Sequence, residues 1–183
     1  MDTDAGDKPD LGRLGGVVAP EILHAVDVAS RVLREAGIPH ALAGGLAVGA
    51  YGYPRTTEDV DFLVGDEAYV FHGGGLVTLK VPVYSVGTIR VDLISFAESK
   101  GEAGQLRPAV DSPIKSGKIP VVPLTALVYM KLKAARQKDL ADLVELLKRG
   151  RIDVGVIDDY LQQHAPDLAR KWDRVKETAA SEE

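Results

Sequence analysis

The fold is decided by residues 59–64, which have the sequence DVDFLV. This β-branched and apolar stretch predicts a strand, and successive side chains of a strand point to opposite faces of the sheet. Asp59 and Asp61 therefore share one face, where two neighbouring carboxylates repel each other. A divalent cation removes this repulsion, because Mg²⁺ binds one or two carboxylates together with water and substrate phosphates. Taken alone, an Asp-x-Asp tripeptide is more often a solvated strand face.

A third carboxylate lies in the apolar stretch Val91-Asp92-Leu93-Ile94. This stretch also predicts a strand, and a buried carboxylate without a partner would be costly there. If the strand lies beside residues 59–64, Asp92 can join the face that carries Asp59 and Asp61. Three converging carboxylates then predict a site for Mg²⁺ or Mn²⁺.

Upstream, a short apolar strand at residues 40–43 is followed at once by Gly44-Gly45 and a short helix over residues 46–51. Free N–H groups at a helix start favour phosphate, and glycine lets the backbone approach a ligand closely. Taken alone, Gly44-Gly45 favours a simple tight turn. The P-loop pattern of glycines followed by Lys and Ser or Thr is absent from the sequence.

Together these residues resemble a known family. The string Gly44-Gly45, then Arg55-x-Thr57-x-Asp59-x-Asp61, then Asp92 one strand later is similar to the minimal nucleotidyltransferase fold of the polymerase-beta-like superfamily. The resemblance extends over about residues 20–148. It points to the AbiEii-type branch, which contains toxins of bacterial toxin–antitoxin pairs and many stand-alone proteins.

A late motif of that branch resembles the stretch from Lys131 to Asp142. We expect one long helix from Leu124 to about Lys148, in which positions 131, 135, 138 and 142 fall on one face. Lys131, Lys138 and Asp142 would then point together into a cleft, whereas the alternative is an exposed, ion-paired helix face.

The resemblance implies Mg²⁺-dependent transfer of a nucleoside monophosphate from a nucleoside triphosphate to a hydroxyl acceptor. In this interpretation Asp59, Asp61 and Asp92 are both the catalytic residues and the metal ligands. The residues implied in nucleotide binding are Gly44, Gly45, Arg55, Thr57, Lys131, Lys138 and Asp142. One departure is that the family helix between the two Asp strands is missing or reduced to a turn within residues 65–75.

The acceptor is not decided by the sequence. Six basic residues between Lys115 and Lys138 favour a phosphate-rich acceptor such as tRNA or another RNA, and the resemblance adds an antitoxin as a potential partner. One alternative is an antibiotic-type adenylyltransferase that modifies a small molecule. Another is a non-catalytic nucleotide-binding or antitoxin module. His72 could reach the site, although a histidine in a turn usually has no function.

The composition limits the remaining possibilities. The net charge is −5 and the pI is about 5.4, so general binding to nucleic acid is not expected. The absence of cysteine excludes thiolate catalysis, disulfides and cysteine-based zinc sites. No apolar run has the length of a membrane span and no signal peptide is recognisable, so we expect a cytoplasmic protein without a membrane partner.

The expected fold class is α/β (α+β), in the order α-β-α-β-β-β-α. It consists of a small mixed sheet flanked by helices, followed by a helical C-terminal part. The expected divisions are a disordered leader over residues 1–17, a nucleotidyltransferase core over 18–122, helices completing the cleft over 123–178, and an acidic tail over 179–183. Residues 99–116 are expected to form a loop, residues 76–86 an extended segment broken or at an edge near Pro82, and residues 153–163 and 166–178 short helices.

Overall fold

The computed structural model describes residues 8–72, 77–80, 85–96, 103–149 and 152–182. Its centre is a six-stranded mixed sheet with the strand order β5-β6-β2-β1-β8-β7, in which β2–β6 and β1–β8 are parallel pairs and the other pairs are antiparallel. The predicted α/β class with a small mixed sheet is confirmed. The strands are β1 (His40–Leu42), β2 (Asp59–Val64), β5 (Ser85–Val86), β6 (Ile89–Ser95), β7 (Ile114–Ser116) and β8 (Ile119–Val121).

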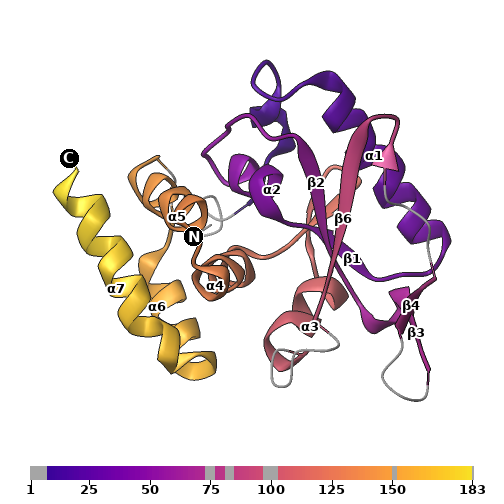
Figure 1. Cartoon of the computed structure of the whole chain (residues 1–183). Coiled ribbons are helices and arrows are strands. Elements are labelled where there is room, and N and C mark those ends of the chain that lie inside the picture. Colours follow the sequence, from indigo (N-terminus) through magenta and orange to yellow (C-terminus); the bar gives the residue numbers. More distant parts are fainter. Residues whose placement is uncertain (1–7, 73–76, 81–84, 97–102, 150–151, 183) are drawn as a thin grey trace, which may run out of the picture.

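Helix α1 (Pro20–Glu35) packs across one face of this sheet (Figure 1). Proline at its first position has no N–H to leave unsatisfied, and Gly37 ends it in the left-handed region at φ 70°. The buried His40 connects α1 to the strands, because its ring lies edge-on to Phe62 and its Nε2 is 2.9 Å from Ser30 Oγ. The side chain of Phe62 therefore points to the face of the sheet that α1 covers. Asp59 and Asp61 alternate with Phe62 along β2, so they point to the opposite face.

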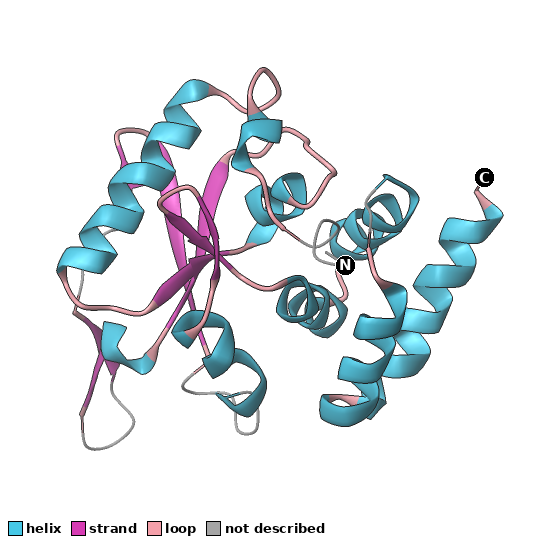
Figure 2. Ribbon diagram, turned by 180° about the vertical axis from the view of Figure 1, so that it is seen from behind, coloured by secondary structure: helices cyan, strands magenta, loops and turns pink. Residues whose placement is uncertain are grey.

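On that opposite face lie α2 (Gly44–Ala50) and then the C-terminal helices, which group to one side of the sheet in both views (Figures 1 and 2). These are α4 (Leu124–Ala134), α5 (Gln137–Arg149), α6 (Val154–His164) and α7 (Pro166–Ser181). Trp172 is buried between them, with its Nε1 donating to Asp158 Oδ1 at 2.8 Å. The helical C-terminal part is confirmed, and the buried Trp172 has a packing role in it. No helix among the described residues has both the length and the apolarity that a membrane crossing needs.

The expected single helix from Leu124 to Lys148 is wrong. The chain leaves the helix at Ala135, which has a left-handed backbone at φ 50°, and α5 starts two residues later. The N–H of Ala135 donates to the carbonyl of Lys131 at 2.8 Å, which closes the last turn of α4. Because of this turn, α4 and α5 are two helices packed against each other.

The loop expected over residues 99–116 is also wrong where it is described. Residues Ala103–Asp111 form α3 although Pro108 lies inside it, and residues 114–116 form β7. Burial of Leu106, Ala109 and Val110 stabilises this helix against the poor propensity of proline.

The described part of the expected leader is ordered. Residues Leu11–Leu14 form the 3-10 helix η1, the Asp10 N–H donates to the Ala50 carbonyl at 2.9 Å, and Leu14 is fully buried against α2. Disorder is therefore wrong for this part, while residues 1–7 lie outside the described residues. The acidic tail also starts later than expected, because α7 continues to Ser181.

Between the two Asp strands, the chain forms the three-residue 3-10 helix η2 (Asp66–Ala68) and a separate small sheet of β3 (Tyr69–Phe71) and β4 (Val77–Leu79). The expected reduction of the family helix is confirmed for the described residues. The extended segment expected over 76–86 is broken as predicted, because β4 and β5 belong to different sheets. Residues 73–76 and 81–84, with Pro82, lie outside the described residues.

Candidate active site

The carboxylates of Asp59, Asp61 and Asp92 converge on one face of the sheet. Parallel pairing of β2 with β6 sets Asp61 beside Asp92 and Asp59 beside Arg90, so the alternating side chains fall on the same side. One carboxylate oxygen from each residue lies within 4.8 Å of the others, and all three residues are partly buried. We call these three residues the triad. Oxygen ligands at this spacing fit a hard divalent cation such as Mg²⁺.

The carboxylate of Asp61 is electrostatically perturbed by its surroundings. Burial, followed by repulsion from Asp59 and Asp92, raises the pKa of Asp61 from 3.8 to about 6, although Lys131 and Arg136 act in the opposite direction. A carboxylate with this pKa is poorly stabilised by the protein alone. The triad therefore favours binding of positive charge.

The start of α2 lies directly against the triad. Gly44 has φ 60°, and a Cβ atom at this position would overlap the Asp61 carboxylate. At Gly45 a Cβ atom would lie 3.1 Å from Arg55 Nη2 and 3.3 Å from Thr57 Oγ1. Glycine at both positions lets the chain pass close to the triad and to the 55–57 loop.

Two polar side chains hold the outer members of the triad. Thr57 Oγ1 donates to Asp59 Oδ1 at 2.9 Å, so Thr57 orients a candidate metal ligand. Arg90 Nη2 contacts Asp59 Oδ2 at 3.3 Å and Asp92 Oδ2 at 2.9 Å. The sequence interpretation missed Arg90, although strand alternation places residue 90 on the same face as residue 92.

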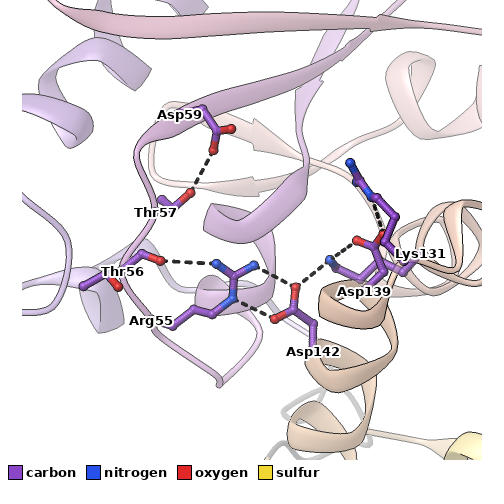
Figure 3. A network of polar contacts seen from close by, with 8 residues as sticks. Arg55, Thr56, Thr57, Asp59, Lys131, Asp139 and Asp142 are labelled. Carbon is purple, nitrogen blue, oxygen red and sulfur yellow. Dashed lines mark hydrogen bonds and ion pairs between the residues drawn. The ribbon is translucent and has the colours of Figure 1, made fainter.

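An ionic network, largely buried except for its exposed member Arg136, joins the 55–57 loop to α4 and α5 (Figure 3). Arg55 donates to both oxygens of Asp142, from Nε at 2.7 Å and from Nη2 at 2.8 Å. Lys131 Nζ lies 2.7 Å from Asp142 Oδ2 and 3.1 Å from Asp139 Oδ1, and Arg136 Nε donates to Asp139 Oδ2 at 2.7 Å. We call these five residues the clamp.

Asp142 is the centre of the clamp, and its side chain is 2% exposed. Burial by itself would raise the pKa of Asp142, but hydrogen bonds from Arg55 and Lys131 outweigh burial and the pKa is lowered. Asp142 is therefore held as an anion that ties the sheet to the C-terminal helices.

The prediction that Lys131, Lys138 and Asp142 share one face of a single helix is wrong, because they lie on two helices. Lys131 and Asp142 do meet, because the turn at Ala135 folds α5 back beside α4. Lys138 is exposed and does not line the site, and its neighbour Asp139 contacts Lys131 instead. His72 is also away from the site, since it is exposed and its Nε2 lies 3.1 Å from Thr78 Oγ1 in the small sheet.

A cavity of about 590 Å³ opens beside the triad, which is a size typical of small-molecule sites. Its charged lining consists of Asp61, Asp92, Lys131, Lys133, Arg136 and Asp139, next to Gly44. Along β6 the lining changes from the charged Asp92 to the apolar Ile94. The apolar part of the wall continues with Leu106 of α3 and with Leu127 and Met130 of α4. The cavity can therefore hold a ligand with one anionic part and one apolar part.

Comparisons with known proteins give a distant likeness. No protein-family model and no curated protein matches the sequence. A crystal structure of an antigenic nucleotidyltransferase-like protein from Paracoccidioides brasiliensis aligns with 90% of this chain and 94% of that chain, with 17% sequence identity and a TM-score of 0.43. A likeness at this level assigns neither a family nor a function to the chain.

Proposed function

We propose that this protein is a Mg²⁺-dependent nucleotidyltransferase that moves a nucleoside monophosphate from a nucleoside triphosphate to a hydroxyl acceptor. The observation that carries the proposal is the triad, with carboxylate oxygens within 4.8 Å of one another beside a cavity that is also lined by Lys131 and Arg136. Carboxylates for metal ions and basic side chains for phosphate are the groups that phosphoryl transfer requires.

The reaction is a displacement at the α-phosphorus atom. The acceptor hydroxyl oxygen bonds to this atom while the bond to the bridging oxygen breaks and pyrophosphate leaves. Asp59, Asp61 and Asp92 would hold Mg²⁺, which would neutralise charge on the phosphates and on both reacting oxygens. The side chain of Asp92 is 41% exposed and is therefore accessible to an acceptor. We assign Asp92 the role of the general base that takes the proton from the attacking hydroxyl.

The basic residues divide into two roles. Lys131 and Arg136 line the cavity and would offset charge on the departing pyrophosphate. Arg55 donates to both oxygens of Asp142, so we assign Arg55 and Asp142 a positioning role in holding the cavity wall formed by α4. Gly44, Gly45 and Thr57 shape the floor beside the triad, and Lys138 has no assigned contact with the nucleotide.

For the acceptor, we propose a hydroxyl of tRNA or another RNA. Lys133 and Arg136 are exposed residues in the cavity lining and would offer contacts to RNA phosphates, which supports this acceptor. The resemblance to the AbiEii-type branch is consistent with an RNA acceptor and with a toxin that has an antitoxin partner. A non-catalytic nucleotide-binding or antitoxin module remains the alternative function, and it predicts binding without release of pyrophosphate.

The test is label transfer from each α-labelled nucleoside triphosphate in turn, with Mg²⁺ and separate RNA, protein and metabolite fractions. Asp61→Asn should lower the transfer rate on the order of a thousandfold or more, because it removes a metal ligand. Asp66→Asn removes an exposed carboxylate on η2 and is the matched control. Label in the RNA fraction that depends on Asp61 supports the proposal. Triphosphate binding with no transfer to any fraction would favour the non-catalytic module.

A further inference from the structure

We propose that Arg90 is an internal counter-ion of the triad that a divalent cation must displace, so that the triad binds the cation tightly only together with a triphosphate. This inference rests on the proposed function, because it concerns the same metal site. Its subject is the regulation of metal binding by a residue outside the set of metal ligands.

The contacts of Asp59 and Asp92 set up a direct competition. Asp59 Oδ1 accepts the hydrogen bond from Thr57, which leaves Oδ2 as its second oxygen. Arg90 Nη2 forms an ion pair with this Oδ2 at 3.3 Å and with Asp92 Oδ2 at 2.9 Å. A cation bound by the Oδ2 atoms of both residues would occupy the position of the guanidinium. Arg90 therefore has to leave before the triad can close around a metal ion.

Arg90 is poorly placed for a purely structural role. Its side chain is 66% exposed, and ion pairs that are exposed to this extent contribute little to stability. Its charge acts on the triad instead, where three carboxylates share one face of the sheet. Lys131 and Arg136 also face this region, but both are engaged with carboxylates of α5. Among the residues that the structure describes, Arg90 is thus the cation that pairs with the two outer carboxylates of the triad.

A triphosphate changes the balance of this competition. It supplies phosphate oxygens to the metal ion, and Mg²⁺ sites commonly consist of one or two carboxylates plus substrate phosphates. It also offers the displaced guanidinium a new partner, since arginine binds phosphate through two parallel hydrogen bonds. Metal and triphosphate then strengthen each other's binding, and this coupling is reciprocal. Without the triphosphate, the cation must break two ion pairs of Arg90 with no replacement.

The test measures binding of radiolabelled Mn²⁺ by equilibrium dialysis, with and without inorganic tripolyphosphate as a probe that needs no nucleobase. Arg90→Gln should bind Mn²⁺ alone about tenfold more tightly than the wild type, the size expected for two exposed ion pairs. The gain in Mn²⁺ affinity on adding tripolyphosphate should shrink in this variant. The matched control is Arg107→Gln, because Arg107 also pairs with two carboxylates, Glu67 and Asp111, away from the triad.

Thermal unfolding gives a second readout that does not depend on turnover. In chelator, Arg90→Gln should have a Tm close to that of the wild type because exposed ion pairs contribute little to stability, and Mn²⁺ should raise its Tm by more than it raises that of the wild type. Equal Mn²⁺ affinities of Arg90→Gln and wild type would overturn this inference but not the proposed function. Mn²⁺ binding that is unaffected by Asp61→Asn, with or without tripolyphosphate, would overturn both.

Discussion

Replacement of Asp61 by asparagine should make the metal-free protein more stable at neutral pH. The folded protein raises the pKa of Asp61 from 3.8 to about 6, so the native state binds this proton more tightly than the unfolded chain does. As the pH rises from about 4 through about 6, the wild type loses the stability that the proton provides, whereas the neutral asparagine loses nothing. A rise of the pKa from 3.8 to about 6 corresponds to roughly 3 kcal/mol, because a tenfold change in proton affinity is worth about 1.4 kcal/mol. Because Asp61 is only partly buried, solvent screening reduces the expected gain to about 1–2 kcal/mol.

The measurement is urea unfolding in chelator at several pH values between 4 and 8. The two stability curves should coincide near pH 4 and separate until about pH 7, with Asp61→Asn above the wild type. Asp66→Asn serves as the control, and its curve should follow that of the wild type within about 0.5 kcal/mol. A variant that is no more stable than the wild type at pH 8 would refute the view that burial and like charges strain this carboxylate.

Three further substitutions, together with one control, test other parts of the structure by denaturant unfolding. Gly44→Ala should destabilise the protein by more than the roughly 1–2 kcal/mol that a left-handed alanine costs, because its Cβ also overlaps Asp61. Gly87→Ala, with the same φ of 60° and open space around it, should show the backbone cost alone. Asp142→Ala should cost about 3–5 kcal/mol, since it leaves the charges of the clamp uncompensated, and a loss below 1 kcal/mol would contradict the clamp. Leu14→Ala should cost about 3 kcal/mol because its side chain is fully buried, whereas a loose leader predicts almost no change.

The triad could be predicted from the sequence because its geometry is local. Alternation along residues 59–64 places two carboxylates on one face, and one further pairing, of β2 with β6, adds Asp92. Arg90 lies two residues before Asp92 in the same predicted strand, so alternation alone places it on the face of the triad. Its pairing with Asp59 and Asp92 depends on the side-chain conformation of an exposed arginine, which the strand pattern does not determine.

The errors have a common physical origin in tertiary contacts. Ala135 is the best helix former by propensity, yet it adopts the left-handed conformation that separates α4 from α5. Pro108 argues against α3, which burial of Leu106 nevertheless stabilises, and the glycine-rich start of the chain hides the anchor at Leu14. The turn at Ala135, helix α3 and the burial of Leu14 all depend on tertiary contacts, so the residues next to them in the sequence do not predict them. Lys131 and Asp142 were likewise predicted to meet on one helix face, although a turn between two helices brings them together.

The pairing of Leu42 with Val121 has a consequence for the order in which the chain assembles during synthesis. β1, β2 and β6 are all available once residue 95 has been made, so the triad can form early from pairs of low contact order. β8 can add to β1 only after residue 121 emerges, and α4 and α5 follow later still. A nascent chain would therefore carry the complete triad before it has a cavity, and the edge of β1 would stay exposed to intermolecular pairing until β8 arrives.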